Sequence, residues 1–367
     1  MALPVVLSLP ACADYQSTVA PYLHQLAAWP ETFFSSVSKP AALHQLYLDT
    51  NPLITAIAFA FALAPIFLVV SEVNKNYSQV DRVWSILPTI YNAHFAVYSH
   101  LAGIRTARLD AVLILSTLWT TRLTYNYFRK GGYSVGSEDY RWAIVKDYVG
   151  PTVMFLFNVV FISLVQSLLL VSITTPTYVL LLTERLALYE GPIKSWNILD
   201  TVAFSAILSL IATSFVADQQ QWNYHLAKGK YQKTARVPHG WHRAELDRGF
   251  LTKGLFAYSR HPNFAAEQGV WVTLYLWSCV ATRTSYNWTA VGAIAYLFLF
   301  QASTWLTELL SARKYSEYTE YRKQVGKFLP IPGYTHPVFH HYNTKHADGT
   351  AAKEEDAAKA GQRYELR

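Results

Sequence analysis

Long apolar stretches separated by shorter polar connections dominate the pattern along this chain. Each of the clearer stretches is close to the ~20 residues that an α-helix needs to cross a bilayer. Seven spans are predicted, at Pro52–Val70, Trp84–Leu101, Leu109–Phe128, Pro151–Ile173, Ile198–Val216, Ala265–Ala281 and Thr289–Leu310. The second span is the weakest, because Asn92 and His94 interrupt it. The pattern therefore predicts an all-α polytopic membrane protein with about seven transmembrane helices.

The same pattern divides the chain into three parts. Residues 1–50 form an N-terminal extension, and residues 51–335 form the helical membrane domain. Residues 336–367 form a tail that is rich in Ala, Lys, Glu and Gly. Because such a segment has little apolar surface to bury, we expect a polar, disordered C-terminal tail.

Composition supports the membrane setting. Charged residues make up 15% of the chain, well below the roughly 25% that is usual in soluble domains. The 11 Trp and 25 Tyr are residue types that concentrate at membrane interfaces. The two cysteines, Cys12 and Cys279, are too few for a disulfide framework or a zinc site, so no metal centre is predicted. The net charge of +7 falls in connections between apolar helices, which fits membrane topology better than nucleic-acid binding.

The distribution of Lys and Arg predicts the orientation. One alternate set of connections, at 72–82, 121–148, 217–263 and 309–332, contains 20 Lys and Arg, whereas the other set contains 5. The positive-inside rule therefore places the first set and the C-terminus in the cytosol. Two glycosylation sequons, at Asn287 on the lumenal side and at Asn76 on the cytosolic side, offer a test of this orientation.

A cluster of polar residues stands at the mouth of the sixth apolar run. Arg260, His261, Asn263 and Glu267 flank Pro262 there, and Pro suits the first turn of a helix. Ionisable groups are costly near hydrocarbon, so such a cluster more often lines a site than faces lipid. A helix N-terminus with Arg and His beside it is suited to holding phosphate. The alternative is an interfacial anchor of Arg and His that only fixes the depth of the helix.

Two further cytosolic segments carry candidate chemistry. Arg122, Asn126 and Arg129 recur at spacings of four and three, so they share one helix face that suits phosphate or carboxylate recognition. The alternative for this face is a snorkelling basic collar at the membrane edge.

The last segment contains Glu308 and then Tyr315, Tyr318 and Tyr321, three residues apart. This aromatic stripe is more typical of packing than of a ligand platform, although its hydroxyls can still donate hydrogen bonds to a ligand.

These segments together resemble a known family. Residues 254–267 are similar to the Gly-Leu-x-x-x-Ser-Arg-His-Pro-Asn-Tyr-x-x-Glu signature of the steroid 5-alpha-reductase C-terminal domain superfamily. Asp81–Ser85, Arg122–Arg141, Ala217–Gln220 and Lys314–Pro330 resemble its "domain of unknown function 1295" branch, and the resemblance covers roughly residues 70 to 332.

The resemblance implies a membrane-embedded oxidoreductase of the endoplasmic reticulum that reduces a carbon–carbon double bond of a steroid or other lipid with NADPH. The expected partners are therefore a lipid or steroid substrate and the membrane, with no nucleic acid. More distant relatives are isoprenylcysteine carboxyl methyltransferases, so an S-adenosylmethionine-dependent lipid or prenyl-cysteine methyltransferase is the alternative. An inactive membrane scaffold is a third hypothesis.

By matching positions, the resemblance places Arg260, His261, Asn263, Glu267, Glu308 and Tyr315 in the cofactor pocket. We add Arg122, Asn126 and Arg129 as cofactor-binding candidates on the cytosolic side. Tyr315 and Glu267 are the candidate catalytic acids, because both can donate a proton when protonated.

The chain departs from the family pattern at two positions. Phe264 stands where Tyr is usual, which removes one hydroxyl and keeps the scaffold reading open. Thr307 precedes Glu308 where the methyltransferases have a second Glu, which counts against methyl transfer.

Overall fold

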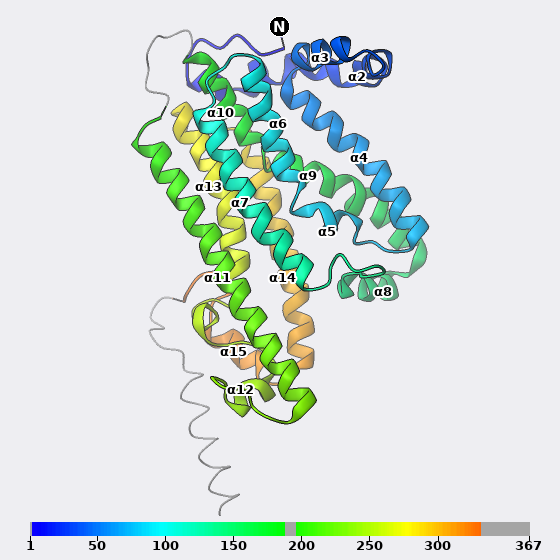
Figure 1. The fold of residues 1–367 in the computed structure, drawn as a ribbon, viewed down its shortest axis with the longest axis vertical. Coiled ribbons are helices and arrows are strands. Elements are labelled where there is room, and N and C mark those ends of the chain that lie inside the picture. The colour runs from blue at the N-terminus through cyan, green and yellow to red at the C-terminus, as the bar shows by residue number, and fades with distance from the viewer. Residues whose placement is uncertain (1, 188–195, 332–367) are drawn as a thin grey trace, which may run out of the picture. The chain divides into compact units, whose positions relative to one another are not determined.

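The computed structural model describes residues 2–187 and 196–331, which are mainly helical (Figure 1). The tail predicted for residues 336–367 lies outside this range. The chain forms two compact units: unit 1 comprises Met1–Ile211 and Gln268–Leu299, and unit 2 comprises Ala212–Glu267 and Phe300–Arg367. Helices α11, α13 and α14 contribute residues to both units.

The elements follow one another with short connections. In chain order they are η1 (Pro10–Ala13), α1 (Tyr15–Thr18), η2 (Ala20–Tyr22), α2 (Leu23–Ser36), α3 (Pro40–Asp49), α4 (Pro52–Asn74), α5 (Gln79–Trp84), α6 (Leu87–Leu101), α7 (Ala107–Arg129), α8 (Tyr140–Phe157), η3 (Asn158–Val165, a π-helix), α9 (Gln166–Ser172), α10 (Thr175–Leu186), α11 (Ile198–Thr234), α12 (Arg243–Arg248), η4 (Gly254–Ala257), α13 (Pro262–Thr282), α14 (Ala290–Lys314) and α15 (Tyr318–Gln324).

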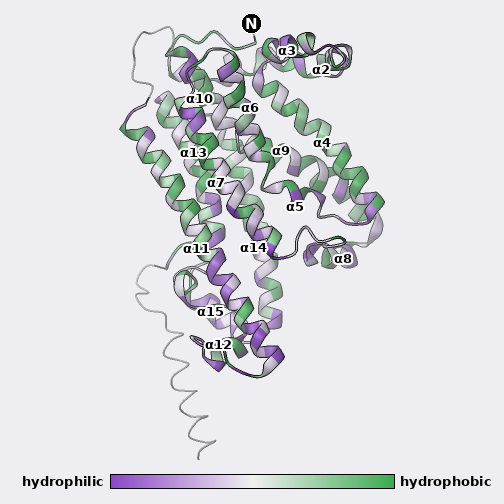
Figure 2. Cartoon of the chain, in the orientation of Figure 1, coloured by the Kyte–Doolittle hydropathy of each residue, from purple (hydrophilic) through white to green (hydrophobic). Residues whose placement is uncertain are grey.

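Within residues 2–187 and 196–331, four helical stretches are long and apolar enough to cross a membrane. They are Pro52–Asn74, Tyr140–Leu186, Ile198–Thr234 and Ala290–Lys314. All seven predicted spans are helical, but the number seven is not confirmed, because α6, α7 and α13 do not reach this level of length and apolarity. Helix α6 has only 15 residues, and α7 carries Arg108, Asp110 and Arg122 within its length. Figure 2 shows the contrast between the largely hydrophobic α4 and the largely hydrophilic α12 and α15.

Helix α11 extends well beyond the predicted end of its span. The sequence predicts that the span ends at Val216 and that a basic connection at 217–263 follows, yet the helix continues to Thr234. The prediction of a loop was wrong because the segment turns polar without losing its helix-forming Gln, Ala and Lys residues. The helix ends only where Ala235 takes a positive φ of 53° and Pro238 follows.

The core of unit 1 contains a helix that is buried on every side. All twelve residues of α10 are buried, and the N-terminal extension covers part of it. The Tyr178 hydroxyl donates to the Thr18 carbonyl at 2.8 Å, and Arg185 donates to the Pro4 carbonyl at 3.0 Å. The extension therefore belongs to the packed core of unit 1, although it lies outside the resemblance.

Neither sequon offers a free asparagine. Asn287 is buried, and its amide donates to the Ser278 hydroxyl at 3.0 Å while its carbonyl oxygen accepts from the Thr289 N–H at 3.0 Å. The Asn76 amide is also buried and donates to the Ser137 carbonyl at 2.9 Å. Glycosylation is thus a poor reporter of orientation, and the cytosolic C-terminus stays a prediction.

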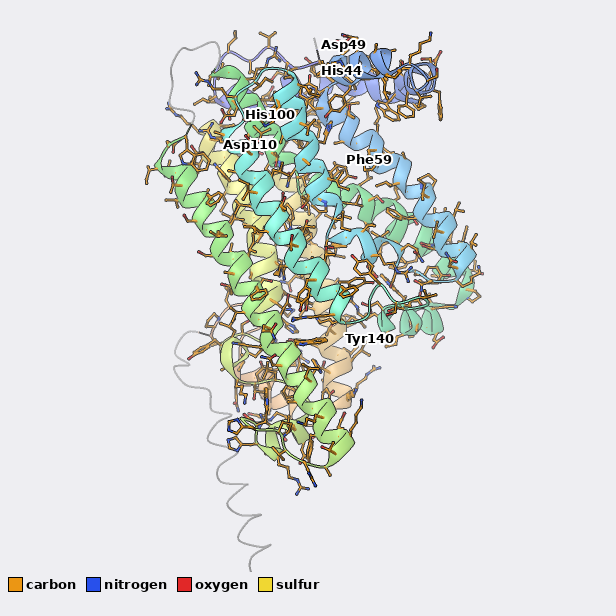
Figure 3. The ribbon with its side chains drawn as sticks, in the orientation of Figure 1. His44, Asp49, Phe59, His100, Asp110 and Tyr140 are labelled. Carbon is orange, nitrogen blue, oxygen red and sulfur yellow. The ribbon has the colours of Figure 1, made fainter. Side chains whose placement is uncertain are left out.

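A buried cluster of charged side chains lies inside unit 1. Arg108 donates from Nε and Nη2 to the two carboxylate oxygens of Asp200, at 2.8 and 3.1 Å. Asp200 also accepts from the Trp277 indole at 2.7 Å, whereas the fully buried Glu184 lies 3.5 Å from Arg108. On the exposed side, His100 and Asp110 join α6 to α7 at 3.0 Å (Figure 3).

We expect Asp200→Asn to destabilise the protein by about 3–5 kcal/mol, because it leaves Arg108 without its bidentate carboxylate in a buried site. Glu184→Gln is the matched control and should cost much less, since Arg108 keeps both bonds to Asp200. Urea unfolding in detergent measures the two losses. Equal losses would show that Arg108 depends on both carboxylates alike.

Candidate functional site

In unit 2, the Ala217–Gln220 motif packs against the motif at residues 254–267. Gly254 has a φ of +66°, and a Cβ there would lie 2.6 Å from the Gln220 side chain. The Gln220 carbonyl oxygen accepts from the Leu255 N–H at 2.9 Å. Glycine is therefore required at 254 for both conformation and space, and it brings the segment before α13 onto α11.

A buried ion cluster forms around the Arg260 side chain. Its Nε and Nη2 donate to the Glu308 carboxylate at 2.7 and 3.3 Å. Its Nη1 donates to the Arg322 carbonyl at 3.0 Å and to the Val325 carbonyl, at the end of α15. The Arg260 side chain is 8% exposed and that of Glu308 is 3% exposed. Arg260 thus fastens the start of α13 to α14 and α15, and its guanidinium is bound within the protein.

His261 and Arg322 complete this cluster. His261 Nε2 lies 3.0 Å from Glu308 Oε1, and the His261 ring stacks on Phe264 at a centroid distance of 5.5 Å. Phe264 in turn packs edge-on against Phe300, so its ring orients the imidazole. Arg322 Nε lies 3.4 Å from Glu308, and its side chain is 44% exposed. Arg322 is therefore the cation of this cluster that solvent reaches most freely.

The first turns of α13 contain the remaining predicted residues of this motif. Asn263 donates from its amide to Asp218 at 3.2 Å, and Asp218 is buried. Glu267 follows one turn later on the same face and is also buried. Unit 2 therefore brings Arg260, His261 and Glu308 into direct contact and places Asn263 beside the Ala217–Gln220 motif.

Tyr315 is held by a residue that the sequence did not single out. Lys228 Nζ donates to the Tyr315 hydroxyl at 3.2 Å and to the Gly249 carbonyl at 2.8 Å. Gly249 has a φ of +90°, and a Cβ there would lie 2.2 Å from the Tyr315 ring. Lys314 lies 5.4 Å from the centroid of the same ring. The phenol thus lies against a glycine backbone with an ammonium at its hydroxyl.

The other two tyrosines of the stripe are packing residues. Tyr318 and Tyr321 are buried around Phe250, at centroid distances of 5.0 and 5.3 Å. The Tyr321 hydroxyl donates to the Phe256 carbonyl at 2.5 Å. Burial raises the pKa of both phenols, so they remain neutral. The packing interpretation therefore holds for these two, whereas Tyr315 is only partly buried.

The polar face predicted on α7 belongs to unit 1. Arg122 and Asn126 are buried, and Arg129 donates from Nε to the Asn126 carbonyl oxygen at 3.0 Å. The Arg129 guanidinium also lies 5.4 Å from the centroid of the Tyr125 ring. The three residues share a face as their spacing predicts, and their role toward a cofactor stays a prediction.

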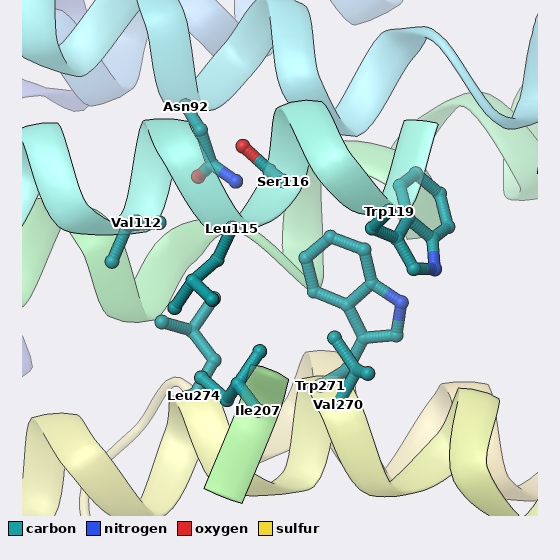
Figure 4. Close-up of a pocket in the computed structure, with 9 residues that line it drawn as sticks. All are labelled: Asn92, Val112, Leu115, Ser116, Trp119, Ile207, Val270, Trp271 and Leu274. Carbon is teal, nitrogen blue, oxygen red and sulfur yellow. The ribbon is translucent and has the colours of Figure 1, made fainter. Parts of the chain in front are cut away.

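Unit 1 also contains a small apolar pocket (Figure 4). Trp119 and Trp271 meet there edge to face at 5.0 Å. Asn92 is fully buried; its carbonyl oxygen accepts from Thr177 at 2.8 Å, whereas its Nδ2 has no partner in the described part of the chain. The cavity volume of about 20 Å³ is room for about one water molecule, far below the ~300–1,000 Å³ of typical small-molecule pockets. The lining residues are Asn92, Val112, Leu115, Ser116, Trp119, Ile207, Val270, Trp271 and Leu274.

Comparison with known proteins defines the class. The family model described as "Protein of unknown function (DUF1295)" matches residues 67–325. An uncharacterized protein of Schizosaccharomyces pombe is 37% identical over 330 residues, which cover 89% of this chain and 93% of that protein. The chain therefore belongs to the DUF1295 family, as its motifs indicated. No solved structure matches it.

The geometry changes what we expect of Arg260→Ala. If Arg260 only bound a phosphate, its removal would weaken ligand binding and leave the stability of the protein unchanged. In this structure the substitution leaves the buried Glu308 without its bidentate partner. We therefore expect a loss of about 3–5 kcal/mol in stability without any ligand. Arg322→Ala, at a half-exposed cation on the same carboxylate, should cost less than about 1 kcal/mol. Thermal unfolding of both variants measures this, and an unchanged Arg260→Ala protein would contradict the assignment.

Proposed function

We propose that this protein is a membrane-embedded oxidoreductase that reduces a carbon–carbon double bond of a steroid or other lipid with NADPH. The observation that carries the proposal is the Lys228–Tyr315 pair, which lies in the same unit as the Arg-His-Pro-Asn motif of a reductase-like superfamily. A phenol hydroxyl with an ammonium 3.2 Å away is suited to giving up a proton.

The donor set of unit 2 suits a polyanionic dinucleotide. Its described residues contain thirteen Lys and Arg against seven Asp and Glu. Arg322 and Lys314 are exposed and are the cations we assign to the phosphates, with His261 and Asn263 as further cofactor contacts. Arg260 and Glu308 would position these groups through their own ion pair. NADPH, when bound, supplies the hydride.

Proton transfer is the step that the chain's own residues would perform. Reduction of a double bond conjugated to a carbonyl places negative charge on the carbonyl oxygen, and an acid must then supply a proton. Tyr315 is the first candidate, because its hydroxyl can donate a proton, its side chain is only partly buried, and Lys228 Nζ lies 3.2 Å from that hydroxyl. Glu267, a buried carboxyl at the start of α13, is the second candidate.

The substrate part of the proposal rests on the membrane setting, because a steroid or other lipid can reach the protein sideways from the bilayer. The cavity of unit 1 does not hold it, since its volume of about 20 Å³ has room for about one water molecule. A cytosolic position of unit 2 in the endoplasmic reticulum is part of the proposal, because NADPH is supplied from that side.

Ligand titration of the purified protein tests the proposal against its alternatives. A ligand at 100 times its Kd stabilises a folded protein by about 2.7 kcal/mol through mass action. We expect NADPH to raise the melting temperature and S-adenosylmethionine to leave it unchanged. Stabilisation by S-adenosylmethionine alone would favour the methyltransferase, and an effect of neither ligand would favour the scaffold.

Substitution of the candidate acids tests their assignment. With an enone lipid that the wild type reduces, Tyr315→Phe should lower the rate by about 10²–10⁴-fold, the usual contribution of a general acid. NADPH should still stabilise this variant. Tyr258→Phe, at a 52% exposed tyrosine of the same unit, is the matched control. If Tyr315→Phe keeps full activity and Glu267→Gln loses it, Glu267 is the acid; if both keep full activity, neither is.

A further inference from the structure

The hairpin of α2 and α3 exposes far more apolar surface than its position in a packed unit would suggest. No side chain in either helix is buried. Nevertheless α2 contains Leu, Trp and Phe residues along its whole length. Contiguous exposed apolar surface of this kind marks an interaction site.

The exposed apolar residues of α2 form a single stripe. Leu23, Ala27, Pro30, Phe34 and Val37 are spaced four, three, four and three residues apart, so they lie on one helix face. Phe34 is 74% exposed, Val37 49% and Leu23 43%. Thr32 lies opposite the stripe, and the polar residues His24, Glu31 and Ser35 lie between Thr32 and one edge of the stripe.

A neighbouring flank of α2 is already covered by the protein. Trp29 and Phe33 stack at 4.7 Å and are partly buried. The Gln25 carbonyl oxygen accepts from the Asn51 N–H at 2.9 Å, the Tyr47 hydroxyl lies 2.9 Å from His94 Nδ1, and the Tyr98 hydroxyl donates to the Leu48 carbonyl at 3.1 Å. These bonds fix the hairpin, so the stripe cannot turn inward.

The hairpin lies at the end of a membrane-crossing helix. Helix α3 ends at Asp49, and Asn51 caps the N-terminus of α4, one of the four candidate spans. Figures 1 and 3 show α2 and α3 at this end of α4, with His44 and Asp49 on α3 and Phe59 further along α4. If α4 crosses the bilayer, the hairpin lies at the depth of the lipid headgroups, where Trp and Phe are favoured.

We propose that the α2–α3 hairpin lies flat in the bilayer interface and inserts the stripe of Leu23, Ala27, Pro30, Phe34 and Val37 among the lipids. The partner is the lipid surface itself. Since α2 and α3 contain no Lys or Arg, insertion depends on apolar contact and does not require anionic lipids.

The test uses the full chain in phosphatidylcholine nanodiscs, with a fluorophore on a single introduced cysteine. Phe34→Cys places it on the stripe, and Thr32→Cys places it on the polar side of the same helix. Cys12 and Cys279 are buried, and the wild type serves as the labelling blank. We expect a lipid-attached quencher to act severalfold more strongly at position 34 than at 32, and iodide to show the reverse order.

Equal iodide quenching at the two positions would overturn the proposal, because the stripe would then be in water. Protection of position 34 from both quenchers would also overturn it, in favour of a protein partner or a second copy on the stripe. A further pair of variants uses a label at a third position, with position 34 left free for substitution. Phe34→Asp should weaken insertion of a label at position 23, and Ser35→Asp on the polar side should leave it unchanged.

Discussion

The buried pair of Arg260 and Glu308 is the interaction on which unit 2 depends. It joins residues 48 positions apart in the sequence, and it extends through the Arg322 and Val325 carbonyls to the end of α15. Burying two charges is costly unless the geometry is good and the remaining donors are satisfied. Here the fork of the guanidinium matches the carboxylate, and the spare donors find carbonyls that the end of a helix leaves open. One side chain therefore closes the unit and satisfies the helix terminus.

That role constrains any ligand that unit 2 binds. Since the Arg260 charge is matched inside the protein, the accessible positive charge must come from residues at its edge, such as Arg322 and Lys314. Arg260 and Glu308 then have a structural role, and the side chains available to a ligand lie around this pair. Phe264 also has a structural role, because its ring orients His261 by stacking on it, and stacking does not require the hydroxyl of a Tyr.

Some of this arrangement could be predicted from the sequence, and some could not. Helical periodicity placed Arg122, Asn126 and Arg129 on one face, as the structure shows. The resemblance grouped Arg260, His261 and Glu308, which the structure brings into contact, and their role in a cofactor pocket stays a prediction. The pairing of Lys228 with Tyr315 was missed, because α11 was expected to end at Val216 and Lys228 was assigned to a loop. The number of spans was not confirmed because apolar length alone does not distinguish a membrane helix from a helix such as α7, whose polar face packs inside unit 1.

The buried polar groups of unit 1 differ in whether they are hydrogen-bonded. Arg108 and Asp200 form a bidentate pair in unit 1, and Asp200 also accepts from the Trp277 indole, so this cluster holds helices together. Asn92 differs. Its carbonyl oxygen accepts a hydrogen bond from Thr177, whereas its Nδ2 has no partner in the described residues, and the residue lines the small apolar pocket. A buried donor left unpaired costs about 1–3 kcal/mol. A single water molecule would remove that cost, and the cavity volume of about 20 Å³ has room for about one.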